Sequence, residues 1–110
     1  MRLMRTGRCY PRETLVALMR FCQRNGLHFI SDEVYALSVF DNPDAPDAVP
    51  FTSALSINPS DIIDPNFVHV IYGLSKDFGA AGLKVGCLIT RNEELKRAIT
   101  AVQRLSLIHI

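Results

Sequence analysis

The sequence predicts an α/β fold in which a mostly parallel sheet is flanked by helices. Two observations lead to this prediction. An amphipathic helical pattern is followed directly by a short apolar run, and helix, tight turn and strand together make half of a βαβ unit. A second apolar run, at 69–72, precedes a glycine-rich segment, a third strand and a last helix. The 110 residues, 48% of them hydrophobic, match the size and apolar fraction of one small globular domain.

The first expected element is a helix from Pro11 to Asn25. Its apolar residues recur at i, i+3, i+4 and i+7, as Leu15, Leu18, Met19 and Cys22. Pro11 suits a first helical turn, and Gly26 suits a C-terminal cap. The apolar run 27–30 follows at once and is bounded by polar residues. This pattern predicts a buried parallel strand.

A long connection should follow the first strand. Between residues 36 and 66, five prolines and several aspartates leave little room for regular structure beyond a short piece near 51–57. The apolar run 69–72 then predicts a second buried strand, and 85–90 predicts a third. Connections as long as 36–66 are usually functional or run over the surface.

A last helix is expected from Glu93 to about Arg104. Asn92 can cap its first turn, because a side-chain oxygen at that position accepts a free backbone N–H. Its buried stripe should consist of Leu95, Ile99 and Val102. The final residues, 105–110, stay apolar without a capping signal, which indicates a truncated or non-native end.

Composition excludes several classes of function. A net charge of +1, from 12 basic and 11 acidic residues mixed along the chain, provides no field for nucleic acid or an anionic membrane. No stretch reaches the ~18 apolar residues of a spanning helix, so a cytoplasmic location is the default expectation. Three cysteines without a CxxC pair predict free thiols rather than a disulfide framework or a zinc site, with Cys22 and Cys87 on apolar faces. The three histidines are interpreted as structural: His28 and His69 in predicted strands and His109 in the tail.

Two segments place polar groups just beyond the carboxyl end of a predicted strand, where open α/β sheets bind their ligands. The first is SDEVY at 31–35. The second is SKDFG at 75–79, which continues through the glycines at 82 and 86. A lysine in a glycine-rich loop, taken alone, is usually just solvated. The joint occurrence of both segments is therefore what makes them informative.

The two segments resemble the aminotransferase class I/II family of pyridoxal-phosphate (PLP) enzymes, in particular its 1-aminocyclopropane-1-carboxylate synthase-like branch. The resemblance runs from about Gly7 to Arg104 and rests on SDEVY at 31–35 and on GLSKDFGAAGLKVG at 73–86. It implies that residues 7–104 are the central part of the large cofactor domain of a fold-type-I enzyme. Residues 1–6 would be a non-matching start.

The resemblance also implies roles for three residues. Lys76 would form a Schiff base with the cofactor aldehyde and later move the Cα proton of the substrate. Asp32 would face the pyridine nitrogen and keep it protonated, since a nearby carboxylate favours the cationic form. Tyr35 would donate its hydroxyl to the phenolic oxygen of PLP. An isolated Asp32 or Tyr35 would otherwise be a cap or an ordinary half-buried ring.

The residues expected at the cofactor phosphate depart from the family pattern. Lys84 stands eight residues after the lysine, where the family usually has arginine, so the charge is kept but the bidentate geometry is lost. Gly73 stands where the family often has serine, and Ser75 would compensate in part. Both changes concern the grip on the phosphate and leave the reacting groups in place.

Parts that the family uses elsewhere are not found in these 110 residues: a phosphate loop, a stacking aromatic, an asparagine and a carboxylate-binding arginine. The sequence therefore predicts part of a homodimeric enzyme acting on an amino acid, by transamination or by elimination. The chain by itself should show no turnover. Two other interpretations remain open: a catalytically silent remnant, and an unrelated small α/β module with an anion cradle at 79–86.

Overall fold

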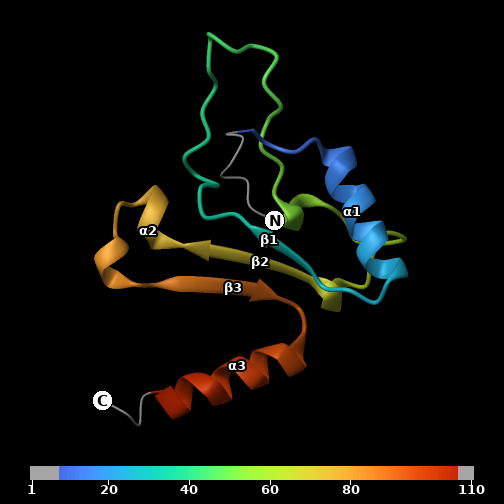
Figure 1. Cartoon of the computed structure of the whole chain (residues 1–110), viewed down its shortest axis with the longest axis vertical. Helices are drawn as coiled ribbons and strands as arrows, with labels where there is room; N and C mark the ends of the chain where they lie inside the picture. Colours follow the sequence, from blue (N-terminus) through green and yellow to red (C-terminus); the bar gives the residue numbers. More distant parts are fainter. Residues whose placement is uncertain (1–7, 107–110) are drawn as a thin grey trace.

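The structure, a computed structural model, describes residues 8–106 (Figure 1). The predicted start at 1–6 and most of the predicted tail, with His109, lie outside the described residues. In chain order the elements, with η for a 3-10 helix, are α1 Arg12–Arg24, β1 Phe29–Asp32, η2 Ala54–Ser56, η3 Pro65–Phe67, β2 Val68–Gly73, α2 Leu74–Asp77, η4 Ala81–Leu83, β3 Gly86–Thr90 and α3 Glu93–Ser106.

The helix α1 confirms the amphipathic pattern of the sequence. The carbonyl of Pro11 accepts the N–H of Thr14 at 3.0 Å and so begins the first turn. The chain leaves the helix through Gly26, whose φ of 61° lies in the left-handed region that glycine adopts without steric cost. Leu15 and Met19 are buried, which sets the face of α1 that packs toward the sheet.

The strands form one sheet in the order β1-β2-β3, and the α/β prediction is confirmed. β1 and β2 are parallel, whereas β3 runs antiparallel to β2 because the chain turns back through α2 and η4 without crossing the sheet. The predicted start of β1 at residue 27 was wrong. The strand begins at Phe29, so that His28 precedes it, and pairing continues to Asp32 opposite Ile71. Asp32 is thus the last residue of the strand.

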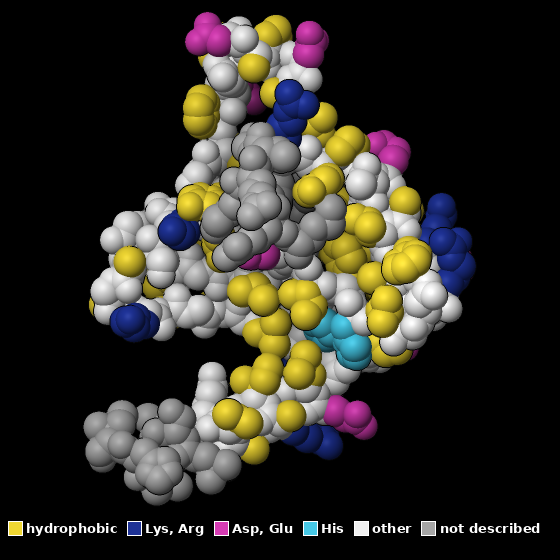
Figure 2. All heavy atoms as spheres, in the orientation of Figure 1, with side chains coloured by type: hydrophobic (Ala, Val, Ile, Leu, Met, Phe, Trp, Pro, Cys, Tyr) yellow, Lys and Arg dark blue, Asp and Glu magenta, His cyan; other side chains and the backbone are white. Residues whose placement is uncertain are grey.

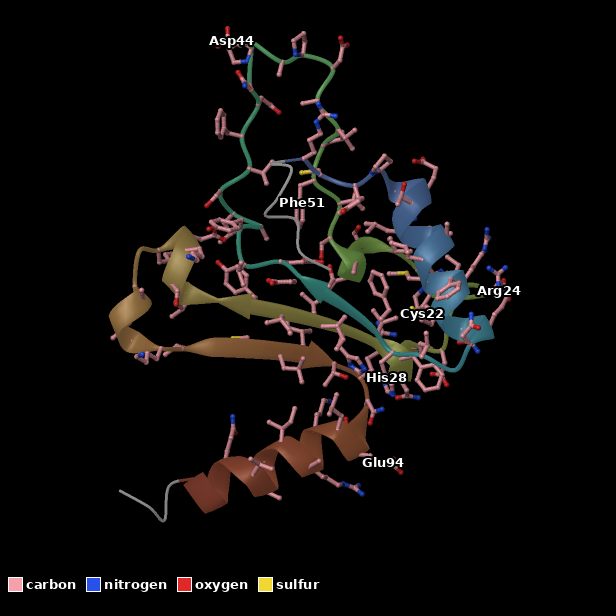
Figure 3. All side chains as sticks on the ribbon, in the orientation of Figure 1. Cys22, Arg24, His28, Asp44, Phe51 and Glu94 are labelled. Atoms are coloured by element: carbon pink, nitrogen blue, oxygen red, sulfur yellow. The ribbon has the colours of Figure 1, made fainter. Side chains whose placement is uncertain are left out.

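The hydrophobic core lies between α1, η2 and one face of the sheet (Figure 1). Its buried members come from segments far apart in the sequence: Leu15, Met19, Phe29, Ala54, Ile57, Ile63 and Val70. The short piece predicted near 51–57 is the 3-10 helix η2, which supplies Ala54, and Ile57 follows it directly. The part of the long connection that precedes η2 extends away from the sheet, and Asp44 lies at its tip (Figure 3).

The other face of the sheet is largely open. Ile71 pairs with Leu88 and shares a face with Ile30, because residues two apart on a strand point the same way. These side chains are 37 to 47% exposed. On the face seen in Figure 2, hydrophobic side chains gather over the middle of the sheet and along α3. The sheet therefore presents apolar surface that the described residues do not cover.

The last helix confirms its predicted cap and corrects its predicted stripe. The side-chain oxygen of Asn92 accepts the N–H of Leu95 at 2.8 Å. Leu95 and Ile99 are half-buried, but Val102 is 65% exposed, since no described element packs over that end of α3. Cys87 on β3 is exposed, although the sequence predicted an apolar face for it, whereas Cys22 is half-buried. All three cysteines are free. No helix within the described residues is long and apolar enough to cross a bilayer.

Candidate active site

The two motif segments meet at one edge of the sheet. Asp32 ends β1, and Lys76 lies in α2, which follows β2 directly. Because β1 and β2 are parallel neighbours, the residues that follow them emerge at the same edge. The Nζ atom of Lys76 lies 5.8 Å from the centroid of the Tyr35 ring, within the range of a cation–π contact. Residues about forty positions apart in the sequence thus face one another.

A hollow of about 420 Å³ opens beside this contact. Asp32 and Tyr35 both line it, together with Arg8, Cys9 and Phe51 among others. Phe51, labelled in Figure 3, comes from the returning arm of the long connection. Asp32 is half-buried, and its Oδ1 accepts the N–H of Val34 at 3.4 Å. The hollow therefore combines a carboxylate, a phenol and apolar walls.

The residues expected at the cofactor phosphate are less closely grouped. Ser75 is half-buried in α2 next to Lys76. Lys84 is exposed at the end of η4 and has a φ of 51°. Within the part of the chain that the structure describes, no hydrogen bond or ion pair joins Lys84 to another residue. The structure thus places Tyr35 beside Lys76 and in the same hollow as Asp32. Ser75 and Lys76 do not line that hollow, and Lys84 lies on the following loop.

Asp77 is a residue of this region that the sequence argument missed. Its carboxylate accepts hydrogen bonds from the N–H of Leu37 and the hydroxyl of Tyr72, both at 2.9 Å, and from the hydroxyl of Ser38. Burial acts against ionisation, but the bonds from Ser38, Leu37 and Tyr72 outweigh it and hold the pKa of Asp77 below its usual value. Burial and the Asp77 carboxylate raise the pKa of Tyr72. The only sequence feature that pointed to Asp77 was its position directly after Lys76.

Glu33, in the middle of SDEVY, has a structural place. It is 5% exposed and accepts hydrogen bonds from Ser31 at 3.0 Å, Ser53 at 2.7 Å and the N–H of Ala54 at 2.8 Å. These bonds tie η2 to the end of β1. The long connection is therefore anchored next to Asp32 by a side chain that the motif itself supplies.

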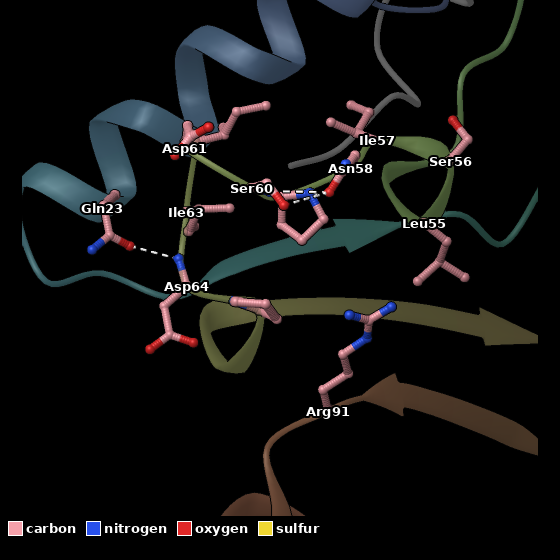
Figure 4. Close-up of a pocket in the computed structure, with 13 residues that line it drawn as sticks. Gln23, Leu55, Ser56, Ile57, Asn58, Ser60, Asp61, Ile63, Asp64 and Arg91 are labelled. Carbon is pink, nitrogen blue, oxygen red and sulfur yellow. Dashed lines mark hydrogen bonds between the residues drawn. The ribbon is translucent and has the colours of Figure 1, made fainter.

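A larger hollow, of about 760 Å³, lies elsewhere (Figure 4). It is lined mainly by segment 55–65, with Gln23 of α1 and Arg91 after β3. In it the N–H of Asp64 donates to Gln23 at 2.8 Å. Because β3 is antiparallel, Arg91 lies at the amino ends of β1 and β2. That is the edge opposite Lys76, so this hollow is separate from the candidate site.

Comparison with known proteins relates the chain to one family. The family described as Aminotransferase class I and II matches residues 5–109. The chain is 50% identical, over 97 residues, to the probable aminotransferase aclI of Aspergillus oryzae, covering 87% of this chain and 23% of that protein. It is 41% identical, over 95 residues, to a human protein named probable inactive 1-aminocyclopropane-1-carboxylate synthase-like protein 2, covering 86% of this chain and 16% of that protein.

A solved structure has the same fold. The crystal structure of aspartate aminotransferase from Thermotoga maritima matches with a TM-score of 0.70 and 32% identity, covering 89% of this chain and 23% of that one. The chain thus spans between about a sixth and about a quarter of the length of these relatives. Because the family match includes both motif segments, their joint occurrence is no coincidence, and the interpretation as an unrelated module is wrong. The chain belongs to the aminotransferase class I and II family.

Proposed function

We propose that this chain forms part of a PLP-dependent enzyme acting on an amino acid, by transamination or by an elimination of the 1-aminocyclopropane-1-carboxylate synthase kind. One observation carries the proposal. The Lys76 amine lies 5.8 Å from the ring centroid of Tyr35, which shares a hollow with Asp32. An amine, a phenol and a carboxylate at one sheet edge are the donor set that PLP requires. The residues present therefore fit this cofactor.

Each of the three side chains has a distinct task in this proposal. Bound PLP supplies an electron sink for the bonds at the substrate Cα. Lys76 would hold the cofactor covalently and would move a proton at Cα. Asp32 would pair with the ring nitrogen and favour its protonated form. Tyr35 would donate its hydroxyl to the phenolic oxygen, and Ser75 and Lys84 would bind the phosphate.

The proposal also includes a homodimer, which rests on the family alone. A second candidate is a protein that keeps the fold but is catalytically silent, and the relatives of Homo sapiens and Mus musculus named probable inactive favour it, at 41% and 42% identity. Turnover of the longer protein that contains this chain separates the two. A silent protein with PLP bound would form no product from any amino acid paired with a 2-oxo acid, measured against free PLP as the background.

The covalent attachment is tested by reduction and peptide mapping. After incubation with PLP and borohydride, we expect the label on the peptide that contains Lys76, and Lys76→Ala should abolish it. Lys96→Ala is the matched control, because Lys96 lies on exposed α3 and pairs with Glu93 at 2.6 Å. A label on another lysine in the wild-type protein would show that the assignment is wrong.

A further inference from the structure

The segment that follows Tyr35 is attached to the helix that carries Lys76 through one carboxylate. Asp77 accepts from the N–H of Leu37 at 2.9 Å and from the hydroxyl of Ser38, forty and thirty-nine residues away in the sequence. Within the segment, the N–H of Ser38 donates to the carbonyl of Tyr35 at 3.1 Å and closes a turn. Asp77 therefore holds this turn, and Tyr35 with it, against α2.

The same carboxylate is itself fixed from the strand side. The hydroxyl of Tyr72, on β2, donates to Asp77 at 2.9 Å, so the carboxylate cannot rotate freely on its short helix. Three donors bind its two oxygens. Charge-assisted hydrogen bonds of this kind are about twice as strong as neutral ones, and they are directional. The geometry therefore links β2, α2 and the turn after Tyr35 into one unit.

We propose that Asp77 is a positioning residue, which sets the placement of the Tyr35 hydroxyl relative to Lys76. The inference rests on the proposed function. Tyr35 is 43% exposed, and the described residues give its hydroxyl no hydrogen-bond partner of its own, so its ring is held mainly by the turn on which it stands. When that turn is released, Tyr35 should lose its placement while Lys76 keeps its covalent chemistry.

The first arm of the test uses the purified protein without PLP. In Asp77→Ala the amide of Leu37 loses its acceptor and should exchange with solvent about tenfold faster, the factor that corresponds to one lost hydrogen bond. Asp77→Asn should stay near the wild type, because the amide oxygen can accept from Leu37 and Tyr72 while its nitrogen donates to Ser38. Asp47→Ala is the matched control on the exposed long connection.

The second arm follows the pH midpoint of the visible absorption of PLP attached to Lys76. In the proposed site the Tyr35 hydroxyl donates to the phenolic oxygen of PLP and so favours the unprotonated Schiff-base nitrogen. Tyr35→Phe should therefore raise the midpoint by about one pH unit. Asp77→Ala should raise it in the same direction. Asp77→Asn should lower the midpoint slightly, since removal of a nearby negative charge disfavours the protonated Schiff-base nitrogen. A positioning effect and a charge effect thus have opposite signs.

Each outcome decides the proposal. Faster Leu37 exchange together with a raised midpoint in Asp77→Ala supports it. A midpoint that falls in Asp77→Ala, as in Asp77→Asn, would show that Asp77 acts only through its charge and overturns the proposal. If Asp77→Ala does not fold, Ser38→Ala removes one bond and should move both readouts the same way by less. If no PLP attaches to Lys76 in the wild type, the proposed function fails, and the exchange of Leu37 still decides whether Asp77 holds the turn.

Discussion

Lys84 has a backbone conformation that residues with a side chain seldom adopt. Its φ of 51° places it in the left-handed region, at the end of η4. Outside glycine this conformation costs about 1 to 2 kcal/mol, because Cβ approaches the following carbonyl oxygen. The sequence shows the substitution of lysine for arginine but not this strain. A strained residue near a proposed phosphate site is consistent with a binding role, since such strain clusters at functional sites.

Two substitutions at Lys84 should separate binding from strain. Lys84→Arg keeps the backbone penalty and adds a planar, bidentate donor. PLP should therefore bind about fivefold more tightly, which corresponds to about 1 kcal/mol, and the free energy of unfolding should not change. Lys84→Gly should weaken PLP binding but raise the free energy of unfolding by about 1 kcal/mol, because glycine relieves the strain. PLP titration and urea unfolding measure the two effects. Unchanged affinity in both variants would remove Lys84 from the phosphate site.

The candidate site residues could be proposed from the sequence because their order along the chain carries the information. Asp32 ends β1, and Tyr35 and Lys76 come shortly after β1 and β2, each in a recognisable motif; parallel pairing of adjacent strands brings such positions together. Asp77 could not be predicted in the same way. Its partners at Leu37 and Ser38 lie on a connection without regular structure, and no periodic pattern indicates where such a connection passes.

At the scale of elements, η2 depends on one buried carboxylate. Glu33 accepts the N–H of Ala54, and both residues are buried. A three-residue 3-10 helix has few internal hydrogen bonds of its own. Its packing in the core therefore relies on Glu33 as well as on the apolar contacts of Ala54 and Ile57.

Removal of this carboxylate should loosen η2. Glu33→Ala leaves the N–H of Ala54 buried without an acceptor, and we expect the free energy of unfolding to fall by about 2 kcal/mol. Glu33→Gln retains an acceptor oxygen and should lose less than half of that. Glu94→Ala, on the exposed side of α3 (Figure 3), is the control and should change stability little. Equal losses in the alanine and glutamine variants would contradict the role of the Ala54 bond.

At the scale of the whole molecule, a chain of hydrogen bonds crosses the sheet at the end away from Lys76. Nδ1 of His28 lies 2.7 Å from Nε2 of His69, whose Nδ1 lies 2.7 Å from the hydroxyl of Thr90. The structural role expected for His28 and His69 agrees with this arrangement. One of the two facing nitrogens must be unprotonated to accept the hydrogen bond, so the contact cannot persist when both rings are in the charged, doubly protonated form. Burial, and then the charge of His28, lower the pKa of His69.

This lowered pKa predicts how stability depends on pH. The folded pKa of His69 lies below its usual value of 6.5, so the unfolded chain takes up the proton first as the pH falls. The contribution of neutral His69 to the free energy of unfolding is complete above pH 6.5. Below that pH it is lost progressively, by at most about 1.4 kcal/mol per pH unit for one proton. Urea unfolding between pH 7.5 and about 5.5 should show this loss, and His69→Gln should reduce it. Constant wild-type stability over that window would contradict the prediction.

The sequence by itself determined the element types and the family, and it predicted Asp32, Tyr35 and Lys76 as the candidate site, because periodicity, caps and motif order are local properties of a chain. Only the tertiary structure decided the antiparallel return of β3, the exposure of Val102 and Cys87, and the partners of Glu33, Asp77 and His69. Each of these depends on which segments lie opposite one another. That choice is made by burial and hydrogen bonding between residues twenty to forty positions apart, which no short pattern in the sequence records.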